Sequence, residues 1–181
     1  MKKIVWTFGL ISGAVMAVFM MATMPFIDDL GHGSLGWLVG YAGMVAAFLL
    51  IYFGVRSYRD NVLGGTIGFG RAFGTGLLIA VIASLCYVAT WEVIYYKFMP
   101  NFYAKYGQSM VEQARKDGKS DAEVAKIRAN MDTMVQRVEN PLFVTAATFA
   151  EPFPVGFIFA LVSAGVLRRK RREHGAELAV A

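Results

Sequence analysis

The stretch at residues 142–167 reads LFVTAATFAEPFPVGFIFALVSAGVL, and the cations RRKRR follow at residues 168–172. A bilayer core of about 30 Å needs about 20 helical residues, so this apolar run predicts a membrane-spanning helix. Lys and Arg collect on the cytoplasmic side of short flanks, and the cations therefore predict that this helix ends in the cytoplasm. The run also contains a carboxylate and two prolines, Glu151, Pro152 and Pro154.

The composition of the whole chain indicates the same class. Of 181 residues, 56% are hydrophobic and 17% are charged, whereas a soluble domain carries about 25% charged residues. The formal net charge is +5, and the RRKRR run places this basicity in one membrane-flanking patch, so no nucleic-acid partner is predicted. A single cysteine, Cys86, excludes a disulfide within the chain.

We therefore predict an all-α membrane protein, a single integral membrane domain over residues 1–181. Its four-transmembrane-helix bundle has spans at residues 4–27, 35–55, 72–98 and 142–167. The first apolar stretch exceeds the roughly 7–15 residues of a signal-peptide core, so we expect it to be retained. Residues 61–71 (NVLGGTIGFGR) are expected to form an interfacial turn or short helix. Trp91, Tyr95 and Tyr96 are expected to form an aromatic belt at the outer end of the third span.

Residues 99–140 form the main water-soluble segment and predict an extracytoplasmic helical hairpin between the third and fourth spans. Gly118 offers a helix stop, and Ser120 with Glu123 has the spacing of a capping box. Apolar residues recur at helical spacing on both halves: Tyr103, Tyr106, Met110 and Ala114, then Val124, Ile127, Met131, Met134 and Val138. These stripes must pack on each other, on the bundle or on a partner.

The charges that flank the spans predict the orientation. In a four-span chain Lys2, Lys3, Arg56, Arg59 and Arg71 fall on the same side as the terminal cations, so both termini are expected in the cytoplasm and residues 168–181 form a basic tail. The long loop also carries Lys and Arg, but the rule applies to short loops. Headgroup anchoring is predicted for the basic residues at this interface, Arg71, Arg168, Arg169, Lys170, Arg171 and Arg172.

Glu151 is the strongest candidate for a ligand or ion site. An ionisable group inside lipid costs about 2.5–3.5 kcal/mol, so it is expected to face the bundle and to have a partner. Pro152 and Pro154 cannot bond the carbonyls of Thr148 and Ala150, which predicts a kink. Those carbonyls and the carboxylate could hold a cation or a polar headgroup. Alternatively, Glu151 bonds a hydroxyl or amide at the kink, or caps a broken helix that starts at Pro152.

Glu92 is the second acidic candidate, near the outer end of the third span. Two neighbouring carboxylates raise one pKa and would create a proton or cation site, but the sequence leaves open whether Glu92 meets Glu151 or Lys97. Asp28, Asp29 and His32 are metal-ligand types, yet their glycine-rich setting and the lack of a second histidine nearby predict no metal site. No cofactor motif and no serine–histidine–acid set is evident, so no catalytic residue is predicted.

Small residues at four-residue spacing occur in every span and predict close helix packing in lipid. They are Gly9 and Gly13, Gly36 and Gly40, Gly76 with Ala80 and Ser84, and Gly156 with Ala160 and Ala164.

The stretch at residues 67–76 reads IGFGRAFGTG and leads into the apolar residues 77–85. Through its F-G-x-A-F-x-x-G pattern, the long helical loop and the glutamate and basic end of the last span, the chain resembles a bacterial membrane family catalogued as domain of unknown function 4199. The resemblance covers nearly the whole chain and implies a cytoplasmic-membrane protein with four spans. It implies no activity and no functional residues.

These patterns favour a non-enzymatic module of the bacterial inner membrane that binds a partner protein or membrane lipid through the hairpin and the Glu151 kink. The alternative is an oligomeric transporter or channel that moves a cation or small solute past Glu151 and Glu92. A lipid-modifying enzyme is a more distant alternative.

Overall fold

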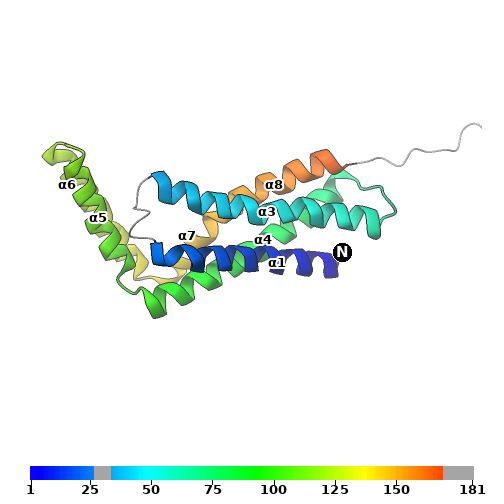
Figure 1. Ribbon diagram of the computed structural model, residues 1–181, viewed down its shortest axis with the longest axis horizontal. Helices are drawn as coiled ribbons and strands as arrows, with labels where there is room; N and C mark the ends of the chain where they lie inside the picture. The colour runs from blue at the N-terminus through cyan, green and yellow to red at the C-terminus, as the bar shows by residue number, and fades with distance from the viewer. Residues whose placement is uncertain (27–33, 169–181) are drawn as a thin grey trace, which may run out of the picture.

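The structure is a computed structural model that describes residues 1–26 and 34–168. The described chain is helical (Figure 1), and its elements are α1 (Lys2–Thr23), η1 (Met24–Phe26), α3 (Ser34–Asn61), α4 (Phe69–Phe98), α5 (Phe102–Lys116), α6 (Asp121–Val138), α7 (Pro141–Ala150) and α8 (Pro152–Leu167). Four segments are long and apolar enough to cross a membrane: Lys2–Thr23, Leu38–Asn61, Phe69–Phe98 and Pro141–Leu167. The four predicted apolar helices are therefore confirmed.

The helix limits differ from the predicted ones around the glycine-rich connection. Helix α3 continues to Asn61 instead of ending at residue 55, and its last turns carry an i,i+4 pair between Arg56 and Asp60 at 3.5 Å. Such pairs support a helix beyond its apolar part. Helix α4 already begins at Phe69. The connection is thus a short turn, in which Gly64 and Gly65 have φ of +67° and +90°, values that favour glycine.

Small residues bring α4 and α8 into close, antiparallel contact. A Cβ added to Gly156 would lie 2.9 Å from Cβ of Ala80 and 2.9 Å from Cζ of Phe48, and one added to Gly76 would lie 3.1 Å from Cβ of Ala160. Helix α1 packs on another side of α4, and α3 packs against α1 and α8. We call this region the closed half: residues 4–13 of α1, 47–58 of α3, 72–84 of α4 and 155–167 of α8. By contrast, Gly40 of α3 faces open space.

The last apolar segment consists of two helices that meet at Glu151. Helix α7 ends at Ala150 and α8 begins at Pro152, which is the interruption that the two prolines predict. Pro152 occupies the first position of α8, where its missing amide hydrogen costs nothing. Helix α7 packs against α4 and α6, whereas α8 packs against α3 and α4. The break therefore lets one apolar segment contact different neighbours on its two sides.

Helices α5 and α6 pack together beyond one end of the four apolar segments (Figure 1). The Ser120–Glu123 capping box is present, and Gly118 has φ of +72°. Val111, Ala114 and Val124 form a small buried cluster between the two helices. The spacing had suggested Met110 for this contact, but Val111 is buried and Met110 is only half-buried. The face of α5 that contacts α6 also includes Gly107, which packs close to Met131.

The C-terminal part of the apolar stripe on α6 packs against the ends of α4 and α7. Val138 is buried with Tyr95 and Val144, and Met134 packs against this cluster. The apolar stripes of α5 and α6 are therefore covered by each other and by the ends of α4 and α7.

Candidate functional site

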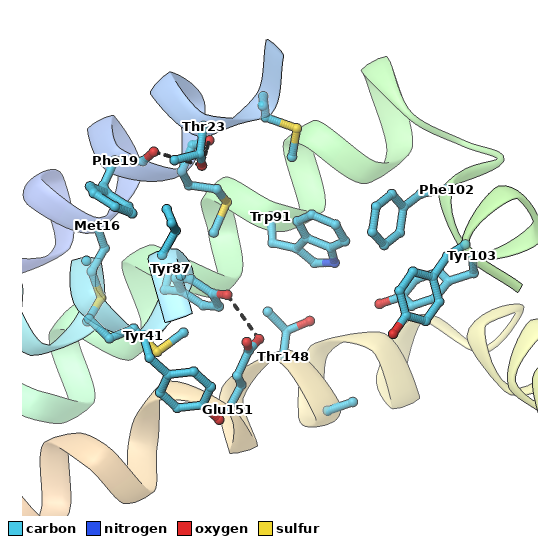
Figure 2. Close-up of a pocket in the computed structure, with 18 of the residues that line it drawn as sticks. Met16, Phe19, Thr23, Tyr41, Tyr87, Trp91, Phe102, Tyr103, Thr148 and Glu151 are labelled. Carbon is cyan, nitrogen blue, oxygen red and sulfur yellow. Dashed lines mark hydrogen bonds between the residues drawn. The ribbon is translucent and has the colours of Figure 1, made fainter. Parts of the chain in front are cut away.

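A cavity of about 530 Å³ lies between the apolar helices and the pair α5–α6 (Figure 2). Its walls come from α1, η1, α3, α4, α5, α6 and α7. We call this region the open half: residues 16–24 of α1 and η1, 39–44 of α3, 87–91 of α4, 147–151 of α7 and the lining residues of α5 and α6. The wall is mostly apolar and rich in methionine, with Met16, Met20, Met24, Met44 and Met134 among its residues.

Glu151 is the one charged side chain among the described residues that line this cavity. The Tyr87 hydroxyl of α4 donates a hydrogen bond to Oε2 of Glu151 at 3.0 Å, shown as a dashed line in Figure 2. Within the described chain the carboxylate makes no ion pair, and Glu151 is exposed where it lines the cavity. The hydroxyl bond is one of the alternatives that the sequence left open, and Glu151 also stands at the N-cap position of α8 without a capping bond from its side chain. Whether the carboxylate holds a cation or a headgroup stays a prediction.

Thr148 lies one helical turn before Glu151 and lines the same cavity, although its residue surface is only 7% exposed. The carbonyls of Thr148 and Ala150 are those that Pro152 and Pro154 cannot bond. The structure therefore gathers a carboxylate, a threonine hydroxyl and a tyrosine hydroxyl at the helix break, in a cavity that is otherwise mostly apolar.

Glu92 is placed differently. Its carboxylate accepts a hydrogen bond from the Thr145 hydroxyl of α7, and Glu92 is not among the residues that line the cavity. Its neighbour Lys97 is exposed near the end of α4. Glu92 and Glu151 thus have separate hydroxyl partners, and the structure does not bring the two carboxylates together in the cavity.

Aromatic side chains of α4 and α5 pack against each other beside the cavity. The ring centroids of Trp91 and Phe102 are 5.0 Å apart, and those of Tyr95 and Tyr103 are 5.3 Å apart, both in edge-to-face geometry. Tyr95 is only 7% exposed and Trp91 is half-buried. The predicted aromatic belt is therefore wrong for these two residues, because contacts with α5 and α7 bury them. Tyr96 is exposed as such a belt requires.

Two tyrosines of the cavity wall belong to α5 and lie outside the apolar segments. Burial raises the pKa of the Tyr103 phenol, and burial also raises the pKa of Tyr106. Both groups therefore stay neutral at physiological pH, where a tyrosine hydroxyl can donate or accept a hydrogen bond.

The sequence analysis identified Glu151 and Thr148 but missed Tyr87, the hydrogen-bond partner of Glu151. The available signal was the pair Tyr87 and Trp91, which stand four residues apart and therefore share one face of α4. Helices α1 and α3 also supply residues to the cavity wall, including Tyr41. No sequence pattern within either helix predicts this, because it depends on how the helices cross.

Two of the predicted headgroup anchors, Arg71 and Arg168, lie at the opposite end of the apolar segments. Arg71 is exposed in the first turn of α4, and Arg168 is exposed just after α8. Because α4 and α8 are antiparallel, these two cations lie at the same end. Several further predicted residues lie outside the described ranges: Arg169, Lys170, Arg171, Arg172, Asp28, Asp29 and His32.

Comparisons with known proteins give one match. A family model described as "Protein of unknown function (DUF4199)" matches residues 7–169. No curated protein and no solved structure matches the chain. The family match covers nearly all of the chain, including α1 from residue 7 onward, the other apolar helices and the residues of the cavity. The chain therefore belongs to the DUF4199 family.

Proposed function

We propose that this protein is a non-enzymatic module of the bacterial cytoplasmic membrane that binds a membrane lipid or another small amphiphile in the cavity of the open half. In this proposal four spans form one bundle, both termini lie in the cytoplasm, and α5 and α6 form an extracytoplasmic hairpin. Support comes from Lys2, Lys3, Arg56, Arg71 and Arg168, because the turns and helix ends that carry them lie away from α5–α6 (Figure 1).

The observation that carries the proposal is a mostly apolar cavity with a few polar groups at one place. Small-molecule sites have volumes of about 300–1,000 Å³ and combine apolar walls with a small number of orienting polar groups. The cavity has about 530 Å³, and Glu151, Tyr87 and Thr148 supply the polar groups. An amphiphile matches both features, since its apolar part would contact the methionine and aromatic side chains and its polar part would meet Glu151.

A protein partner on the α5–α6 stripes is less well supported. The apolar residues that suggested such a surface are packed between α5 and α6 or against α4 and α7. They leave little unpaired apolar surface there for a partner to cover.

The experiment compares ligand retention in three proteins purified from native membranes. Gly40 lines the cavity, and a Cβ added there meets nothing within 4 Å, so Gly40→Leu has room for its side chain and is expected to reduce the cavity from α3. Gly165 on α8 also faces open space but does not line the cavity, which makes Gly165→Leu the matched control. Native mass spectrometry should find a bound small molecule on the wild type and on the control and much less on Gly40→Leu. Equal occupancy in all three proteins would refute the proposal.

A second candidate is an oligomer that transports a cation past Glu151. The exposure of Glu151 in the cavity favours it, whereas the bond from Thr145 to Glu92 lies outside the cavity and removes the second acidic residue from that route. In proteoliposomes this candidate predicts cation flux that Glu151→Gln abolishes. Absence of wild-type flux, or flux that the substitution leaves unchanged, would exclude it.

A further inference from the structure

We propose that the ligand of the cavity is an organic cation, an amphiphile whose ammonium or similar group sits beside Glu151 while its apolar body contacts the methionine-rich wall. This inference rests on the proposed function, because it assumes that the cavity holds a small molecule. It specifies the charge of that molecule, which the proposed function leaves open.

Charge complementarity is the first argument. Among the described lining residues Glu151 is charged, and none is lysine, arginine or histidine. An anionic group would therefore meet a carboxylate and no cation to pair with. Tyr87 donates to only one carboxylate oxygen, Oε2, and within the described chain Glu151 makes no ion pair. A ligand cation would supply the missing partner for the carboxylate.

The aromatic wall is the second argument. Trp91 packs edge to face against Phe102 and against Tyr103, and all three residues line the cavity. Tyr87 lies beside the carboxylate of Glu151 (Figure 2). The negative face of an aromatic ring attracts a cation, most strongly for tryptophan, and cages of aromatic rings recognise quaternary ammonium groups. Aromatic rings together with a single carboxylate therefore favour a cation that is too large or too apolar to hold a full hydration shell.

The remaining wall indicates an apolar body next to the charge. Met16, Met20 and Met24 line the cavity from α1 and η1, and Met44 faces them from α3. Methionine side chains are flexible and polarisable, so they adapt to apolar groups of different shapes. A hydrated inorganic ion would leave this surface uncovered, whereas an organic cation would contact both parts of the site.

The test uses two probes of the same shape and opposite charge, tetraphenylphosphonium and tetraphenylborate. The full-length protein is placed in nanodiscs of uncharged lipid, and binding is measured by equilibrium dialysis, with empty nanodiscs to correct for partitioning into lipid. We expect saturable binding of the phosphonium and none of the borate. Glu151→Gln keeps the size of the side chain and an oxygen that can accept from Tyr87, and it should weaken phosphonium binding by roughly tenfold or more.

Two further variants control for structural effects. Glu151→Asp keeps the charge and should retain more phosphonium binding than Glu151→Gln. Glu92→Gln removes a carboxylate that does not line the cavity, and it should leave the affinity unchanged within roughly twofold. Loss of binding in Glu92→Gln equal to that in Glu151→Gln would overturn the assignment to Glu151.

The outcomes separate this inference from the proposed function. If Glu151→Gln leaves phosphonium binding unchanged, or if the borate binds equally well, the cation inference fails. The cavity function still stands in that case provided that Gly40→Leu abolishes binding of the probe. If neither probe binds, or if Gly40→Leu does not weaken the binding of either probe, this inference fails. The proposed function is then judged by its own result, the small molecule retained from native membranes.

Discussion

The closed half and the open half are built from the same apolar segments but pack differently. In the closed half, Gly156 of α8 lies against Ala80 of α4, and the added methyl of an alanine would have no room. In the open half, Gly40 of α3 has nothing within 4 Å of its added Cβ, and the helices enclose a cavity of about 530 Å³. Glycine therefore brings two helices together at Gly156, whereas at Gly40 it leaves the space beside the helix open.

The comparison shows that the helix break at Glu151 separates two packing regimes. On the α8 side of Pro152, small residues contact small residues, and on the α7 side Val144 packs with the large ring of Tyr95. Large side chains hold helices further apart than glycine and alanine do. The interruption lets one apolar segment take part in both arrangements, and it leaves Glu151 at the boundary.

The largest expected effect is on the closed half. Gly156→Ala places a methyl group 2.9 Å from Cβ of Ala80 and from Cζ of Phe48. Overpacking of this kind lowers the free energy of unfolding by about 1–3 kcal/mol. The measurement is equilibrium unfolding in detergent micelles. The control is Gly165→Ala on the same helix, which meets open space and should not lower stability. Equal losses in both variants would show that the closed half is not tightly packed.

The second prediction is that glycine-to-alanine substitution has the opposite effect on stability in the open half. Gly40→Ala in the open half adds a methyl group that contacts nothing within 4 Å. Alanine is favoured over glycine inside a helix by about 0.8–1.0 kcal/mol in water, so the free energy of unfolding should stay constant or rise by up to that amount. The same unfolding assay checks it. Destabilisation comparable to that of Gly156→Ala would contradict the open space beside Gly40.

The closed half could largely be predicted from sequence, because its determinants are local patterns. Four apolar segments of sufficient length, small residues at four-residue spacing and a proline-broken last segment each have a physical signature. The predicted close packing is present at two of these glycines, where Gly76 lies against Ala160 and Gly156 lies against Ala80.

The open half could be predicted only in part. Glu151 is conspicuous because a carboxylate in an apolar run needs a reason, whereas its partner Tyr87 is an ordinary residue on an apolar helix. The cavity is formed by side chains from seven helical elements, and no spacing along the chain encodes such a space. The aromatic belt failed for Trp91 and Tyr95 for the same reason, since α5 covers them only in the folded chain.

The third prediction concerns pH and tests the turn that leads into α6. The Ser120 hydroxyl and backbone amide donate to Glu123 at 2.7 and 3.0 Å, and these bonds hold the pKa of the Glu123 carboxyl below its usual range. Because the folded pKa is below the unfolded one, this contribution to stability is present above the unfolded pKa and is lost as the pH falls through the folded value. NMR titration of the Glu123 amide should follow this loss, and Glu123→Gln should remove the transition.

The smallest effect should come from a buried hydroxyl of the closed half. Among the described residues, the Ser84 hydroxyl is the fully buried side-chain polar group without a hydrogen-bond partner, whereas the equally buried Ser12 donates to the carbonyl of Ala47 on α3. In a membrane an interhelical hydrogen bond contributes about 0.6 kcal/mol on average. Ser12→Ala should therefore lower the free energy of unfolding by about that amount.

Ser84→Ala should leave the free energy of unfolding unchanged or raise it slightly, because it removes a polar group that folding leaves unpaired. Parallel melts of the two alanine variants in one detergent measure this difference. If Ser84→Ala is instead the more damaging of the two, Ser84 has a partner in the membrane, and close packing alone does not account for the closed half.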